Sequence, residues 1–214
     1  MPRYSHTRRL RSCRLNRKRI GFQMDKYLTR TMGFLNEVGI TVRLVPGATG
    51  FAKHCVIAAG AINVDPRCRV SALLHEAGHL ATVPEQYRNF LSGNVGAGQR
   101  AVFKAVSGIN VFPGSPLDRA VVQIGDGEAT AWGWAAGIHI GIPESRIIRN
   151  DEYSGEGSFI RLGLKVNSYL GINGLANAGF CKVKAHHPSD LPVYPSLAYW
   201  VHPVLDASGS ANHG

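Results

Sequence analysis

The sequence has few cysteines and no long apolar run. The four cysteines, Cys13, Cys55, Cys68 and Cys181, form no C-x-x-C pair and are too sparse for a disulfide framework. No apolar stretch approaches the roughly 20 residues that cross a membrane as a helix, and the basic N-terminal segment lacks the apolar core of a secretory signal. These absences exclude a membrane-spanning or disulfide-rich protein, and we expect reduced thiols and a cytoplasmic location.

Acidic residues are absent before Asp25, where basic residues gather. Residues 1–22 hold eight of the 24 basic residues and none of the 14 acidic ones, which leaves 16 basic against 14 acidic residues in the rest of the chain. We therefore predict a disordered basic arm over residues 1–23, able to contact nucleic acid through phosphate groups. An organelle-targeting segment and an over-extended reading frame are the alternatives. We predict a single domain over residues 24–205 and a disordered tail over residues 206–214.

The most informative pattern that the chain does contain is H-E-x-x-H, formed by His75, Glu76 and His79. Residues four apart lie on nearly the same face of a helix, so both imidazoles can bind one metal ion. A glutamate directly after the first histidine projects toward a metal-bound water and can act on it as a base. We predict a zinc site with His75 and His79 as ligands and Glu76 as the catalytic residue. A buried helix with two hydrogen-bonded histidines is the alternative.

Apolar residues around the motif predict a packed helix. Asp65 is a natural N-cap for this helix, Pro66 fits its first position, and Pro84 ends it. Residues 57–64 form either one strand or two short strands around Gly60.

The order of the predicted elements is typical of an α+β protein. A helix over residues 24–38 and a strand over residues 40–45 precede the strand segment and the motif helix. The glycine-rich residues 93–98 are predicted to form a loop. Further helices are predicted over residues 126–137, 158–165 and 169–175. We therefore expect a small sheet packed beside the motif helix, followed by a mainly helical C-terminal half.

The helix predicted over residues 126–137 carries the best candidate for a third zinc ligand. Asp126 can cap this helix and Gly137 can end it. Glu128 shares a helix face with alanine and tryptophan residues, and a lone acid on such a face is costly to bury without a partner. We therefore predict that Glu128 completes the zinc site. A solvent-exposed glutamate in the first turn of the helix is the alternative.

Residues 34–141 resemble the ImmA/IrrE-type zinc metallopeptidases, a minimal gluzincin group. The similarity lies in the order of the segments. Phe34–Ile40 leads from a helix into a strand, Ile62–Val64 corresponds to an edge strand, and the motif His75–His79 follows. Glu128–Ala131 comes next, followed by Trp134 and Ala135. The resemblance implies a zincin-like metallopeptidase domain. It also implies that His75, His79 and Glu128 bind zinc, with Glu76 as the catalytic acid and base. The segment between His79 and Glu128 is longer than in that family.

The motif sequence His-Glu-Ala-Gly-His also resembles that of membrane-anchored ATP-dependent metalloproteases. The third zinc ligand of those enzymes is an aspartate, and this resemblance covers the motif alone. It keeps Asp126 and Asp118 as alternative ligands, and His139 is a further one.

The sequence as a whole predicts a zinc-dependent metallopeptidase, a hydrolase that cleaves a peptide or a partner protein with a zinc-activated water. Candidates for stabilising the oxyanion are Tyr199, Tyr194 and His139. The alternative function is a non-catalytic zinc-binding or DNA-associated regulatory module that uses the basic arm. A structural zinc site has no use for a carboxylate beside its first ligand, so Glu76 favours the enzyme.

Overall fold

The computed structural model describes residues 24–207. The predicted arm over residues 1–23 and positions 208–214 of the predicted tail lie outside the described residues. The buried apolar side chains of the described part form one continuous core. Among the described residues, no helix combines the length and the apolar character that crossing a membrane requires.

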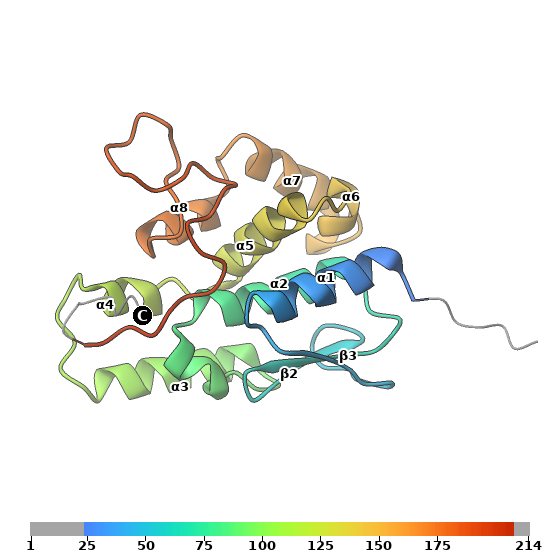
Figure 1. Cartoon of the computed structure of the whole chain (residues 1–214), viewed down its shortest axis with the longest axis horizontal. Helices are drawn as coiled ribbons and strands as arrows, with labels where there is room; N and C mark the ends of the chain where they lie inside the picture. The colour runs from blue at the N-terminus through green and yellow to red at the C-terminus, as the bar shows by residue number, and fades with distance from the viewer. Residues whose placement is uncertain (1–23, 208–214) are drawn as a thin grey trace, which may run out of the picture.

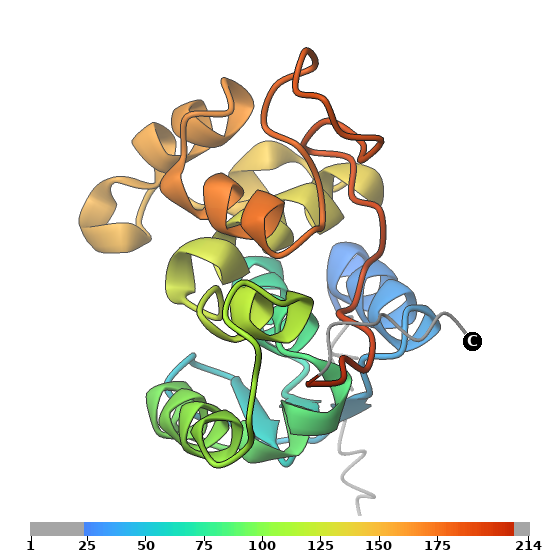
Figure 2. The same cartoon turned by 90° about the vertical axis from the view of Figure 1, so that its left-hand side faces the viewer.

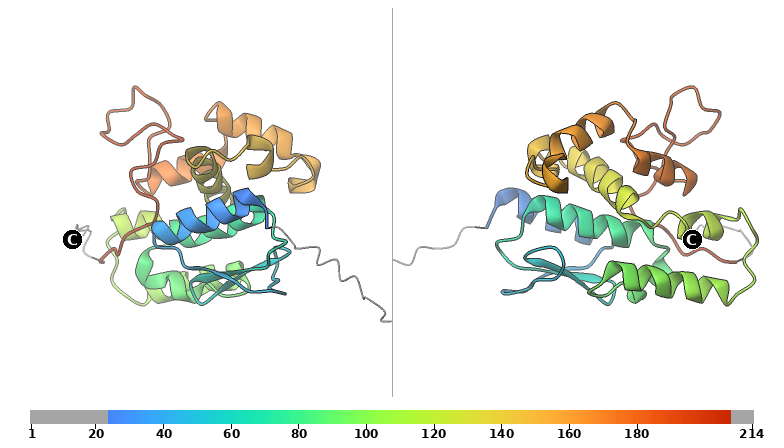
Figure 3. Two further views of the ribbon diagram at one scale, coloured as in Figure 1. Left: turned by 45° about the vertical axis from the view of Figure 1, so that its right-hand side comes forward. Right: turned by 180° about the vertical axis from the view of Figure 1, so that it is seen from behind.

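The first helix, the three strands and the motif helix come first in the described chain, and every later described element is helical, which confirms the predicted α+β class. In chain order the described elements are α1 Lys26–Glu37, β1 Val42–Leu44, β2 Cys55–Ala58, β3 Ala61–Val64, α2 Val70–Thr82, η1 Glu85–Phe90, α3 Val95–Ser107, α4 Pro116–Val121, α5 Asp126–His139, α6 Glu144–Ile147, η2 Tyr153–Gly155, α7 Gly157–Lys165 and α8 Leu170–Asn177. The helices α1 and α2 lie side by side on one face of the sheet, and α5 to α8 lie on the other side of these two helices (Figure 1, Figure 2). Figure 3 shows α3 level with the strands, at one end of the sheet layer. The motif helix α2 is therefore at the centre of the molecule.

The sheet has three short strands in the order β1-β3-β2. The strands β2 and β3 form an antiparallel hairpin, and β1 pairs with β3 in parallel, with Val42 opposite Ile62. The turn between β2 and β3 places Ala59 and Gly60 at positive φ angles of 46° and 76°. Two positive φ angles in a two-residue turn match the twist of a hairpin. The sequence left open one strand or two short strands around Gly60, and the structure has two.

The predicted start of the motif helix is wrong, whereas its predicted end is confirmed. The carboxylate of Asp65 accepts a hydrogen bond from the backbone N–H of Gly47 at 2.6 Å and pairs with the guanidinium of Arg67 at 2.7 Å. Because these contacts hold residues 65–68 in a turn, α2 begins at Val70. The helix ends at Thr82, shortly before Pro84, as the sequence indicated.

Two glycine positions that the sequence predicts to be chain breaks are instead sites of close packing. The predicted loop at residues 93–98 is largely the first turn of α3, and Gly137 lies inside α5 and does not end it. A Cβ atom on Gly98 would lie 2.7 Å from the side chain of Leu91, and one on Gly137 would lie 2.6 Å from the side chain of Ile147. Both glycines are needed because a neighbouring segment approaches the helix closely.

Glycine contacts also lock α5 between α2 and α8. A Cβ atom on Gly78 of α2 would lie 2.3 Å from the carbonyl oxygen of Ala129 on α5, and one on Gly133 of α5 would lie 3.0 Å from the carbonyl oxygen of Leu74. On the opposite side of α5, a Cβ atom on Gly171 of α8 would lie 2.0 Å from a backbone oxygen of α5. The N-terminal half of α5 therefore has a fixed position against the motif helix.

Replacing Gly78 by Ala tests this contact. The added methyl group must displace the backbone of α5, so we expect the free energy of unfolding to fall by about 1–3 kcal/mol, as measured by urea denaturation. The matched control is Gly33→Ala on α1, where a Cβ atom meets nothing within 4 Å. Alanine favours a helix interior by up to about 1 kcal/mol over glycine, so the control protein should be at least as stable as the wild type. Equal stability of the two variants would contradict the close contact between α2 and α5.

Candidate metal centre

The motif helix brings its two histidines together on one face. The Nε2 atoms of His75 and His79 are 3.2 Å apart, and the two rings are nearly perpendicular. The side chain of His79 is 3% exposed and that of His75 is 27% exposed. Ligand atoms at ~2.0–2.1 Å from one tetrahedral ion stand roughly 3.3 Å apart. The spacing of the two nitrogens therefore fits a shared metal ion.

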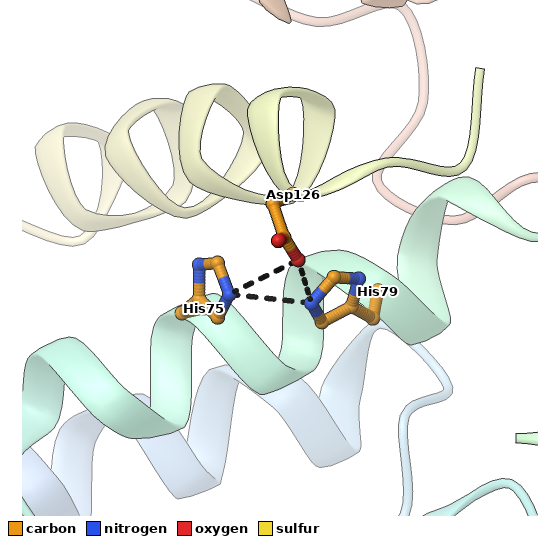
Figure 4. Close-up of side chains that lie close together, drawn as sticks. All are labelled: His75, His79 and Asp126. Carbon is orange, nitrogen blue, oxygen red and sulfur yellow. Dashed lines mark hydrogen bonds and ion pairs between the residues drawn. The ribbon is translucent and has the colours of Figure 1, made fainter. Parts of the chain in front are cut away.

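Asp126, the first residue of α5, supplies the third donor atom. Its Oδ1 lies 3.3 Å from Nε2 of His79 and 3.9 Å from Nε2 of His75, and the three side chains converge on one point (Figure 4). The hydrogen bond with His79 lowers the pKa of the Asp126 carboxyl, which therefore stays ionised at neutral pH. Two imidazole nitrogens and a carboxylate oxygen form a donor set suited to zinc.

Glu128, the predicted third ligand, does not join this group. Its Oε1 lies only 2.0 Å from where a Cβ atom on Gly174 of α8 would stand, so its carboxylate fills the space that this glycine leaves. Residues two apart on a helix point about 200° apart, so Asp126 and Glu128 face different neighbours. Burial raises the pKa of the Glu128 carboxyl. The geometry favours Asp126, an alternative that the sequence left open.

The other two alternative ligands lie in unrelated contacts. The carboxylate of Asp118 accepts a hydrogen bond from the backbone N–H of Gly114 at 2.7 Å, which stabilises the turn before α4. The ring of His139, at the far end of α5, packs against Phe34 and Trp200.

Glu76 lies beside the group, as the motif predicts. Its residue is 6% exposed, and burial raises the pKa of its carboxyl. Ligand-binding clefts typically have volumes of about 300–1,000 Å³. The cleft here has a volume of 880 Å³ and is lined by Glu76 together with His75, His79 and Asp126. A proton acceptor and the three donor atoms therefore face the same solvent-accessible space.

Thr130 orients the first histidine from α5. Its hydroxyl oxygen lies 3.3 Å from Nδ1 of His75 and 2.9 Å from the hydroxyl oxygen of Tyr153. A hydrogen bond from Nδ1–H to Thr130 leaves Nε2 unprotonated and directed toward Asp126. Burial lowers the pKa of His75 to about 4, so the ring is neutral at pH 7. Thr130 lies four residues after Asp126, and this helical spacing was a signal in the sequence that could have identified it.

Sequence reasoning missed two tyrosines of the cleft, Tyr153 and Tyr169. Tyr153 has a positive φ of 54°, which is strained for a residue with a bulky side chain. The preceding Glu152 holds this backbone because its carboxylate accepts hydrogen bonds from the hydroxyl of Ser71 at 2.6 Å and from the backbone N–H of Arg149 at 2.9 Å. No pattern in the sequence indicates that this turn returns to the start of α2.

The tyrosines predicted to stabilise an oxyanion have structural contacts instead. The hydroxyl of Tyr194 donates to the carbonyl oxygen of Ala131, and that of Tyr199 donates to the carbonyl oxygen of Ala178, both at 2.9 Å. Neither tyrosine lines the cleft.

Comparisons with protein-family models, with curated proteins and with solved structures found no match.

Metal binding distinguishes Asp126 from Glu128. We expect wild-type protein to bind about one zinc ion per chain, and Asp126→Ala to weaken binding by at least about 100-fold because one of three protein ligands is lost. Glu128→Gln keeps the shape of the side chain and should retain zinc with nearly unchanged affinity. Competition with a chromophoric chelator measures both variants. Strong loss in Glu128→Gln together with full retention in Asp126→Ala would restore Glu128 as the ligand.

Proposed function

We propose that this protein is a zinc-dependent peptidase that cleaves a peptide or a partner protein. The single observation that carries the proposal is the convergence of His75, His79 and Asp126 beside Glu76 in one cleft. Three protein ligands leave a fourth position open, which is the arrangement of catalytic zinc sites and not of structural ones.

The donor set fits zinc, so the chemistry that zinc supplies can be stated. A zinc ion bound there would polarise the carbonyl group of a substrate and lower the pKa of a water molecule toward neutrality. The protein's own residues supply the positioning and the proton transfer.

Glu76 is proposed as the general base and acid. It would accept a proton from the attacking water and pass that proton to the leaving amine. Its burial supports this role, because the raised pKa makes its carboxylate a better proton acceptor than an exposed glutamate.

Tyr153 and Tyr169 replace the three earlier candidates as donors to the substrate carbonyl oxygen. Both line the cleft, and burial raises the pKa of each hydroxyl, that of Tyr153 to about 12. The hydroxyls therefore stay protonated at neutral pH and can donate hydrogen bonds.

The proposed ligand set bears on the two resemblances. A ligand set of two histidines and an aspartate is the one that the resemblance to ATP-dependent metalloproteases implies, although that resemblance covers only the motif. The resemblance to ImmA/IrrE-type peptidases covers residues 34–141. Two observations do not support it: Ile62–Val64 lies in the central strand β3 and not in an edge strand, and Glu128 lies against Gly174 and not among the ligands. We therefore propose a zincin-like site with Asp126 as its third ligand.

A second candidate function is a DNA-associated regulatory module. The eight basic residues within positions 1–22 favour it, because they could neutralise phosphate groups. Glu76 has no role in such a module, so the peptidase accounts for more of the site.

Replacing Glu76 by Gln tests the mechanism. The variant should keep zinc but lose about 10²- to 10⁴-fold of its hydrolytic rate, because glutamine cannot accept the proton. Mass spectrometry of a digested proteome-derived peptide library measures the activity. Glu85→Gln, at an exposed acid just after α2, is the matched control and should cleave at the wild-type rate. Unchanged cleavage by Glu76→Gln would remove this residue from the mechanism.

A further inference from the structure

A second, smaller pocket of 220 Å³ adjoins the candidate metal centre. It lies between α2, α5, α6 and the turn that contains Tyr153. Its lining includes four buried apolar side chains, namely Leu74 on α2, Trp134 on α5, Ile147 at the end of α6 and the adjacent Ile148. Small residues leave the space open, because Ala72 and Gly133 also form part of the wall.

The pocket and the large cleft meet at the metal centre. His75, Thr130 and Tyr153 line both spaces. A peptide that lies in the cleft with its scissile carbonyl near His75 therefore has a residue beside the scissile bond close to the mouth of the pocket. This shared wall makes the pocket part of the substrate-binding surface.

Glu152, the one acidic residue among the described residues that line the pocket, does not favour a cationic substrate side chain there. Glu152 lines the pocket, but its carboxylate already accepts hydrogen bonds from Ser71 and from the backbone of Arg149, and it lies 3.9 Å from a guanidinium nitrogen of Arg69. A charged group in this pocket would lose its hydration without gaining an unpaired partner. The apolar lining therefore decides which side chains bind.

The volume sets the size of the occupant. A cavity of about 150 Å³ holds a benzene molecule, so the pocket accommodates the side chain of Leu, Met or Phe. Glycine or alanine would leave it largely empty. One methylene group more or less on the substrate side chain changes the preference of a hydrophobic pocket between two substrates by about 10- to 200-fold.

We propose that this pocket is the specificity pocket of the enzyme and selects peptides with a large apolar residue directly beside the scissile bond. The inference rests on the proposed peptidase function, since it assigns the substrate class of the same site. Ala72 on α2 lines the pocket, so a larger side chain at this position would reduce its volume.

The test measures binding, and the peptide-library assay measures cleavage by the same protein. Two peptide hydroxamates that differ only in a leucine or an alanine side chain are titrated into zinc-loaded full-length protein, and the affinity ratio is determined by calorimetry. Wild-type protein should bind the leucine compound at least about 10-fold more tightly. Ala72→Leu fills the pocket, so the ratio should fall to about 3 or less. Ala72→Val is a smaller change that serves if the first variant is unstable, and its ratio should lie between the two.

Ala105→Leu is the matched control, because Ala105 is half-buried on α3 and lines none of the described pockets near the site. Its affinity ratio should equal that of the wild type. Equal affinity of wild-type protein for the two hydroxamates, or no detectable affinity for either, would overturn the pocket assignment. A clear preference for the leucine compound in a protein that cleaves no peptide would support the pocket and reject the proposed peptidase activity.

Discussion

The close contact between α2 and α5 is the constraint on which the rest of the structure depends. Gly78 and Gly133 each lie against the backbone of the other helix, so the two helices meet without side chains between them. This approach places the first residue of α5 above the two histidines of α2. The glycine inside the motif therefore acts in the site although it carries no functional group, because it determines where Asp126 lies.

The two faces of α5 have different roles in the site. Asp126 and Thr130, four residues apart, face α2 and contact the histidines, whereas Glu128 points toward α8 and fills the space beside Gly174. The helix α5 thus supplies a candidate ligand and a group that orients His75. Its contact with α8 through Glu128 holds it in place on the side opposite the histidines. The turn at Tyr153 borders the same region from a third direction and lines both the large cleft and the smaller apolar pocket.

The sequence predicts what depends on local pattern and misses what depends on the approach of distant segments. Helical spacing identified α2 and its histidines, and Gly60 indicated a possible break between two short strands, although the pattern did not decide between one strand and two. The apolar neighbours of Glu128 indicated burial, and the residue is half-buried. They could not show whether its carboxylate lies against α2 or against α8. Gly98 and Gly137 look like chain breaks in the sequence, because its local pattern does not show that Leu91 and Ile147 of neighbouring elements pack against them. Tyr153 was missed for the same reason.

The most direct test of this account is a crystal structure of the zinc-soaked protein with anomalous data collected at the zinc absorption edge. The account predicts one strong anomalous peak at ~2.0–2.2 Å from Nε2 of His75, Nε2 of His79 and a carboxylate oxygen of Asp126. It also predicts that the carboxylate of Glu128 still lies against Gly174. A peak outside this cleft, or a peak between the two histidines that Glu128 ligates in place of Asp126, would contradict the account.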